Sequence, residues 1–172
     1  MNLFILDEDY QQAAEYYQDL HVQKIPLEGV QILQTAYSLE QLAQAPRNQQ
    51  GKIRGHGYFN HPVCKWARQN INNFYWALFH THALHEEFIH RFGHSHFSKC
   101  FSDWCFDNPP NLPDSPKTQH PQCFKDYPQL ISADPVVGYR KYYKVAKNSF
   151  VIRGQIVRAT WTNRPTPDWF LS

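Results

Sequence analysis

The chain has 172 residues, a formal net charge of +2, 42% hydrophobic and 16% aromatic residues. This length predicts one domain spanning 1–172 whose core needs no disulfide or metal to fold, and four cysteines without a CxxC spacing give no reason to expect a disulfide framework. The opening residues MNLFILDEDY hold too short an apolar stretch for a secretory signal, and no apolar run approaches a membrane span, so we expect a cytoplasmic protein with no membrane partner.

The N-terminal part of the chain predicts helices separated by polar loops. Asp7 or Asp9 can cap a helix that runs to Leu20. Pro26 suits the first turn of the next helix, over LEGVQILQTAYSLEQLA, where apolar residues recur at helical spacing. The stretch APRNQQGKIRGHGY, residues 45–58, is rich in glycine and basic residues and predicts a mobile polar loop.

The middle of the chain predicts its longest helix. His61 before Pro62 is typical of a cap followed by a first helical residue, and this helix reaches about Gln69. A longer helix follows to Arg91, with Gly93 as its C-terminal stop.

The C-terminal part predicts two more helices and two extended stretches. Residues 95–106 form a short helix, and the proline-dense stretch NPPNLPDSPKTQHPQ cannot be helical. Asp134 caps a helix that begins at Pro135, and the tail ATWTNRPTPDWFLS is extended. No alternating run predicts a sheet. The expected fold class is therefore all-α: a single compact helical domain with long loops and an extended aromatic C-terminal tail.

Histidines gather on the long central helix. The stretch FHTHALHEEFIHRFGHSH holds six of the chain's ten histidines, His80–His96. His82, Glu86 and His90 recur every four residues, and neighbours at this spacing can share a metal. The zinc signature HExxH is absent, because His90 follows one position too late, and His82 and His85 fall on the core-facing stripe. Two interpretations remain: a divalent-metal site of a metal-dependent hydrolase, or a polar helix edge with one or two hydrogen-bonded core histidines.

A denser group of chemical types lies nearer the N-terminus. In DLHVQKIPLEGVQ the residues His21, Lys24, Glu28 and Gln31 share one face if the stretch is helical. Glu28 could act as a base or stabilise a developing cation, and Lys24 could contact phosphate or act as an amine nucleophile. The alternative is an ordinary Lys24–Glu28 ion pair. Pro26 would separate His21 from Glu28 if it broke the helix.

Rings and cations alternate near the C-terminus. Residues 135–172 hold seven basic residues and one acidic residue, whereas residues 1–134 hold ten basic and fourteen acidic ones. Such a segment suits phosphate and unstacked or flipped bases, although ordinary packing or a solvated helix face is the alternative. The candidate contacts to nucleic acid or phosphate are Arg140, Tyr143, Lys147, Trp161 and Arg164, together with His61.

Two resemblances to known families add to these patterns. The segments LDEDYQQAAEYYQDLHVQK, HPVCKWAR, EEFIHRFGHSH, NPPNLPD and WTNRPTPDWF resemble a small family from phages and bacteria over nearly the whole chain. That resemblance implies no function; if the protein is phage-encoded, its compartment is the host cytoplasm.

The second resemblance is to the all-α pyrimidine-dimer DNA glycosylases of bacteriophages. It rests on a histidine followed by a glutamate seven residues later, as His21 and Glu28 stand here, and on the segments NNFYWAL…HEEFIHRFG and YRKYY. The resemblance implies that Glu28 stabilises a sugar cation and that His21 lines the binding site. The family's nucleophile is the amine of an N-terminal threonine exposed by Met removal. The second residue here is Asn2, which disfavours that removal, so Lys24 is a possible Schiff-base amine.

The leading hypothesis is thus a small enzyme that acts on nucleic acid or a nucleotide, a DNA glycosylase or lyase of DNA repair, with Glu28, His21 and Lys24 as catalytic residues and no cofactor. The metal-dependent hydrolase is one alternative. A non-enzymatic, phage-type binding module is the other.

Overall fold

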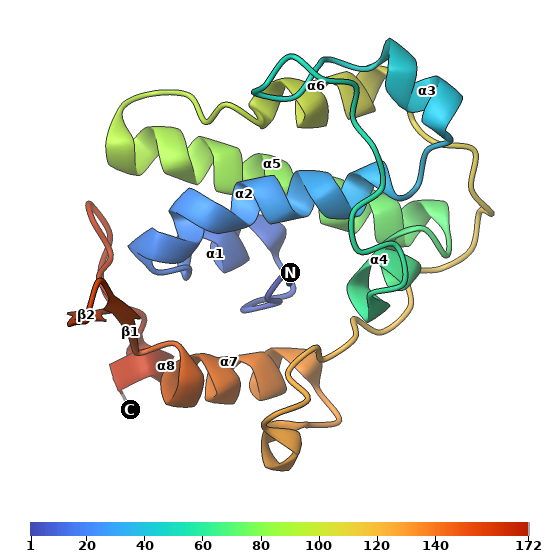
Figure 1. Ribbon diagram of the computed structural model, residues 1–172. Coiled ribbons are helices and arrows are strands. Elements are labelled where there is room, and N and C mark those ends of the chain that lie inside the picture. The colour runs from blue at the N-terminus through green and yellow to red at the C-terminus, as the bar shows by residue number, and fades with distance from the viewer. Residues whose placement is uncertain (172) are drawn as a thin grey trace.

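The computed structural model describes residues 1–171, and helices form about half of it (Figure 1). The expectation of a compact helical chain is confirmed. The elements in chain order are α1 (Tyr10–Glu15), α2 (Asp19–Gln34), α3 (Leu39–Gln44), α4 (Pro62–Ala67), α5 (Ile71–Phe92), α6 (Lys99–Asp107), the 3-10 turn η1 (Pro128–Leu130), α7 (Pro135–Ala146), β1 (Ser149–Ile152), β2 (Gln155–Arg158) and α8 (Asp168–Leu171).

Several helix ends lie where capping residues predict them. The Asp9 carboxylate accepts backbone N–H groups at the start of α1, and Asp134 does the same at the start of α7. His61 caps α4 through its ring. Gly93 ends α5 in a left-handed conformation with φ 74°, which glycine adopts without steric cost.

The first two helices differ from the sequence prediction. The first helix ends at Glu15 rather than Leu20, and α2 starts at Asp19 and continues through Pro26 to Gln34. A proline inside a helix costs about 3 kcal/mol through one lost hydrogen bond and a backbone clash. Burial of the apolar face of α2 offsets that cost, and this face consists of Val22, Ile25, Val30, Ile32 and Leu33.

A small antiparallel hairpin interrupts the helical fold, although we expected no sheet. β1 pairs with β2 through a two-residue turn at Arg153 and Gly154, whose φ angles are 50° and 80°. Positive φ at both turn positions matches the twist of a tight hairpin. Each strand has only four residues, which is too few for an alternation of polar and apolar side chains to predict a strand. The tail after the hairpin also ends in the short helix α8, where we expected an extended chain.

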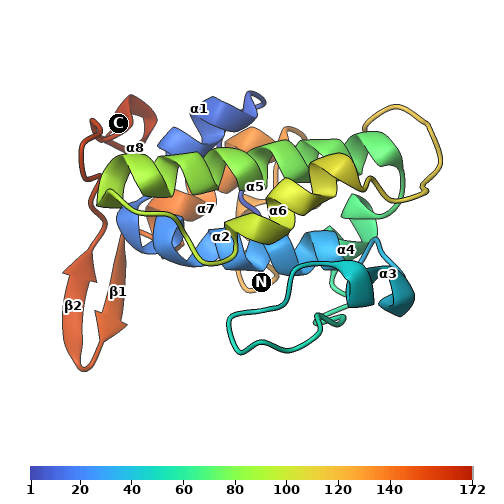
Figure 2. The same ribbon diagram turned by 90° about the horizontal axis from the view of Figure 1, so that it is seen from above.

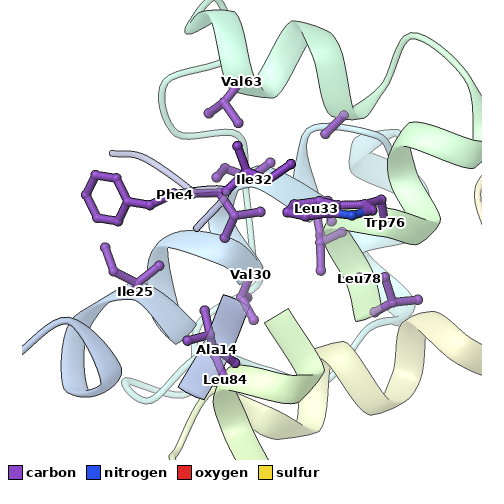
Figure 3. Packing of buried hydrophobic residues seen from close by; sticks show 14 of the residues in the cluster. Phe4, Ala14, Ile25, Val30, Ile32, Leu33, Val63, Trp76, Leu78 and Leu84 are labelled. Atoms are coloured by element: carbon purple, nitrogen blue, oxygen red, sulfur yellow. The ribbon is translucent and has the colours of Figure 1, made fainter. Parts of the chain in front are cut away.

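The core lies where α2 and α5 pack together. Figure 3 shows buried side chains from the N-terminal segment, α1, α2, α4 and α5 meeting around Val30 and Leu33. At Gly29 the backbone of α2 comes so close to α5 that a Cβ atom would overlap the side chain of Thr81. Glycine is therefore required at this crossing.

The N-terminal segment is part of this core rather than a loose end. Leu3, Phe4, Ile5 and Leu6 are buried, and the segment lies between α2 and α7 (Figure 1). The Phe4 ring packs against rings of both helices, with its centroid 4.9 Å from that of His21 and 5.5 Å from that of Tyr143. The segment brings residues 1 and 2 to the side of α2.

Candidate active site

A pocket of about 470 Å³ opens where the N-terminal segment, α2, the end of α7 and β1 meet. Residues from far apart in the sequence line it. Its polar lining is formed by His21, Lys24, Glu28 and Lys147, and its aromatic lining by Phe4, Tyr142 and Phe150. The pocket therefore brings together all three residues predicted to be catalytic and one of those predicted to contact phosphate.

Glu28 is the carboxylate of this pocket. Its Oε2 atom accepts the backbone N–H of Asn2 at 2.7 Å and lies 3.5 Å from the α-amine of Met1. Its Oε1 atom lies 3.4 Å from the Nζ atom of Lys24, which is the ion pair expected from the helical spacing. The Glu28 side chain is only 12% exposed, whereas that of Lys24 is 72% exposed. The carboxylate of Glu28 is thus largely buried and lies between the amines of Met1 and Lys24.

His21 stands beside Glu28 on the same face of α2, because the helix continues through Pro26. Burial lowers the pKa of His21 from 6.5 to about 3, and the charges of Lys147 and Lys24 add to the effect, so the ring is neutral near pH 7. Its Nδ1 atom lies 2.7 Å from the hydroxyl oxygen of Tyr143, which already accepts the backbone N–H of Gln18. If the Tyr143 hydroxyl donates to Nδ1, the proton of the neutral ring sits on Nε2, which can then donate to a ligand.

Lys147 adds a second cation to the pocket wall. It is half-buried at the end of α7, with its Nζ atom 5.3 Å from the centre of the Tyr142 ring. Burial lowers the pKa of Lys147; the like charge of Lys24 adds to this effect, while Tyr127 and Glu28 oppose it.

Three of the predicted nucleic-acid contacts lie outside this pocket and bind other parts of the chain. Arg140 donates to the carbonyl of Leu6 and pairs with Asp7 at 2.8 Å. Trp161 is buried and donates from Nε1 to a backbone carbonyl in the turn after α1. Arg164 pairs with Glu87 of α5 at 2.9 Å.

The two other predicted contacts lie near the pocket without lining it. Tyr143 is fully buried and holds His21 through its hydroxyl, so its role here is to position the histidine. His61 caps α4, and burial lowers its pKa, assisted by the charge of the Met1 amine and opposed by Glu28. The charges of the Met1 amine and Glu28, which both line the pocket, therefore act on the His61 ring.

The histidine-rich helix lines a different pocket, of about 410 Å³, which shares no lining residue with the first. His82 is 3.8 Å from Glu86, and the ammonium group of Lys99 is 3.5 Å from the same carboxylate. Within residues 1–171 no group of three or more His, Cys, Asp and Glu side chains is placed to hold a metal ion. The row His82, Glu86 and His90 therefore gives the metal-dependent alternative no support.

The core histidines of α5 differ in part from the expected pair. His85 is fully buried as expected, with Nε2 2.9 Å from the Ser98 hydroxyl oxygen, but the His82 side chain remains 34% exposed. His80 is the other buried histidine of this helix and contacts the Tyr17 hydroxyl at 3.1 Å.

Sequence reasoning missed the wall opposite α2. Met1, Asn2 and Phe150 line the pocket from the N-terminal segment and from β1. The only signal for the N-terminal segment was its apolar stretch, which predicts burial but not the helix against which it packs. No alternating pattern in the sequence indicated the β1–β2 hairpin.

The fold and pocket define a helical protein with a carboxylate enclosed between amines. Comparison with protein-family models, with curated proteins and with solved structures found no match for this chain. None of the helices within residues 1–171 is long and apolar enough to cross a lipid bilayer. The two family resemblances therefore stay predictions, and the function has to be argued from the pocket.

Proposed function

We propose that the chain is a DNA glycosylase with lyase activity, in which an amine paired with Glu28 attacks the sugar of a damaged or abasic nucleotide. The observation that supports this most is the position of Glu28, whose carboxylate lies 3.5 Å from the amine of Met1 and 3.4 Å from that of Lys24. An amine attacks a sugar carbon only in its neutral form, and a carboxylate in contact with it can take up its proton.

The reaction would proceed in balanced steps. At a damaged nucleotide the neutral amine forms a bond to C1′ of the sugar as the bond from C1′ to the base breaks, and the base leaves with the electron pair and takes up a proton. The amine then loses one proton, and the sugar ring opens as O4′ leaves C1′ and takes up a proton, which gives a protonated C1′=N Schiff base. At an abasic site the amine adds to the C1′ aldehyde, and water leaves to give the same Schiff base. Removal of a C2′ proton then expels the 3′ phosphate oxygen, and water releases the amine.

Glu28 has two roles in these steps. Its negative charge stabilises the positive charge that develops on the sugar and on the Schiff-base nitrogen, and it can accept a proton from the attacking amine. His21 carries no positive charge near neutral pH. With its proton on Nε2, it can donate a hydrogen bond to a sugar or base oxygen.

The rest of the pocket suits a nucleotide turned out of its duplex. Phe4, Tyr142 and Phe150 present rings on which a base can stack, and Lys147 places a cation at the same wall for a flanking phosphate. The segment 135–164 holds seven basic residues and no acidic residue, and five of them remain after the ion pairs of Arg140 with Asp7 and of Arg164 with Glu87 are set aside.

Borohydride trapping tests the proposal. Duplexes containing an abasic site or a pyrimidine dimer are incubated with the protein and reduced, which fixes any Schiff base as a covalent adduct. We expect an adduct whose modified peptide contains Met1 or Lys24, and mapping it identifies the nucleophile. A K65Q variant, altered at an exposed position of α4 outside the pocket, serves as the control and should trap equally well.

The absence of an adduct with either duplex would overturn the proposal. Salt-dependent DNA binding without an adduct would instead favour the non-enzymatic binding module, because counterion release weakens phosphate contacts as salt rises. A thermal shift with zinc, manganese or nickel ions, together with hydrolysis that depends on the metal, would favour the metal-dependent hydrolase.

A further inference from the structure

We propose that the β1–β2 hairpin is a wedge that inserts its apolar tip between base pairs of duplex DNA and so delivers a nucleotide to the pocket beside it. The inference rests on the proposed function, since it takes duplex DNA as the substrate. It concerns a part of the chain for which the sequence suggested no role.

The hairpin exposes apolar side chains that a solvent-facing ribbon would not need. Val151 and Ile156 are each 74% exposed and stand directly opposite each other across the two strands. Ile152, at the tip, is 40% exposed. The opposite face of the ribbon holds Phe150 and Val157, which are half-buried. The apolar pair is thus on the outer face, and exposed apolar clusters of this kind commonly mark contact surfaces.

The charge around this apolar pair favours nucleic acid as the occupant. Arg153 lies in the turn, Arg158 ends β2, and Lys147 precedes β1. No acidic residue occurs between positions 135 and 167. A nonpolar tip bordered by cations matches DNA, because apolar wedges unstack base steps while cations hold the flanking phosphates.

The hairpin is also continuous with the candidate active site. Phe150, Val151 and Ile152 belong both to β1 and to the pocket lining, and the Phe150 ring lies 5.4 Å from that of His21. In Figure 2 the hairpin projects away from the helices on the side of the molecule where α2 lies. A base displaced by the tip would therefore leave the duplex next to the pocket.

Backbone hydrogen bonds hold the β1–β2 hairpin in its extended shape. Its strands are paired along their whole length, from Ser149 with Arg158 to Ile152 with Gln155, and the next residues pair through the N–H of Ala159 and the carbonyl of Asn148 at 2.8 Å. The tight turn fixes the register. A preformed ribbon loses little conformational freedom on insertion.

The test replaces the apolar pair while keeping the ribbon. Threonine has the shape of valine and a high β-propensity, so the double variant V151T/I156T should keep the hairpin but lose its apolar tip. The matched control is I131T, which alters an exposed isoleucine near η1 that does not line the pocket. The probe is a short duplex with 2-aminopurine next to an abasic-site analogue, since this base fluoresces more strongly when unstacked.

We expect wild-type protein and I131T to raise the 2-aminopurine fluorescence, and V151T/I156T to lose most of that rise. Trapping on abasic duplex should fall about tenfold in V151T/I156T, because unstacking has to occur before C1′ can be reached. Trapping on single-stranded abasic DNA needs no unstacking and reports any change in the pocket that Val151 lines, so it should fall far less. Equal fluorescence and trapping in V151T/I156T and wild type would overturn the wedge.

The two proposals can fail separately in this design. A fluorescence rise that depends on Val151 and Ile156, without any adduct, leaves the wedge standing and removes the glycosylase. An adduct that forms on the duplex regardless of the hairpin removes the wedge alone.

Discussion

At the scale of single residues, the molecule buries several histidines in neutral form. Burial lowers the pKa of His21, His85 and His120 to about 3 and that of His80 to about 4, from 6.5 in each case. In the unfolded chain these rings take up protons as the pH falls through 6.5, while the folded chain resists protonation. Their contribution to stability is therefore complete above pH 6.5 and is lost as the pH falls toward 3 to 4.

This shift gives a prediction for acid stability. Each buried histidine can lower the free energy of unfolding by up to about 1.4 kcal/mol per pH unit in this range. Urea unfolding followed between about pH 7 and about pH 5, where carboxylates stay ionised, should show a steady loss of stability on acidification. A free energy of unfolding that stays constant across this interval would contradict the burial of neutral histidines.

Arg91 is the most completely buried charge among the ion pairs of residues 1–171. Its side chain is fully buried, 2.9 Å from Asp19 and 2.6 Å from Glu87. Glu87 lies four residues before Arg91 on α5, a spacing at which side chains can pair, whereas Asp19 lies far away along the chain, so no local pattern could predict its contact with Arg91. These carboxylates also hold the C-terminal tail, since the Asp19 carboxylate accepts the backbone N–H of Thr162 at 2.9 Å.

Removing that guanidinium should be costly. R91M leaves the buried carboxylate of Asp19 without its cation and leaves Glu87 with Arg164 alone, so we expect the free energy of unfolding to fall by about 3–5 kcal/mol. The control is K117M, which breaks the exposed ion pair with Glu8 and should cost no more than about 1 kcal/mol. Both values come from urea unfolding near neutral pH, and similar losses in the two variants would contradict this ranking.

At the scale of elements, the sequence predicted four helix ends but not how the helices continue or pack. Asp9, His61, Gly93 and Asp134 act through local hydrogen bonds or backbone conformation, which a sequence displays directly. The course of α2 through Pro26 depends on packing against distant residues, so the local rule that places proline in the first turn of a helix gave the wrong start for α2.

The crossing of α2 and α5 gives an element-scale prediction. Alanine favours an isolated helix over glycine by about 1 kcal/mol, yet a Cβ atom at Gly29 would overlap Thr81. We therefore expect G29A to lower the free energy of unfolding by about 1–3 kcal/mol. T81A should relieve the overlap, so the double variant G29A/T81A should be more stable than the sum of the single changes predicts. Additive effects in a urea-unfolding cycle would contradict the close approach.

At the scale of the whole molecule, the pocket is assembled from segments that the sequence keeps far apart. His21, Lys24 and Glu28 could be predicted together, because one helix face places them side by side. Lys147 was predicted only as a separate phosphate contact, and Met1, Asn2 and Phe150 were not predicted to line a site. Their positions depend on how α7, the hairpin and the N-terminal segment pack on α2, which no local pattern encodes.

The same packing separates the two histidine-containing regions. His82 and Glu86 lie against Lys99 and Asp103 of α6, whereas Glu28 faces the N-terminal segment. The regions lie in different pockets and cannot form one site. The proposed glycosylase chemistry therefore rests on the Glu28 pocket alone.

The most direct test of this assignment compares borohydride trapping by wild-type protein and by E28Q on the same abasic duplex. Glutamine keeps the size of the side chain and can still accept the N–H of Asn2, but it cannot stabilise a cation or accept a proton from an amine. E86Q, altered in the other pocket, is the matched control. We predict that the rate of adduct formation falls by about a hundredfold or more in E28Q and is unchanged in E86Q. Equal trapping by E28Q and wild type would contradict the central role of Glu28.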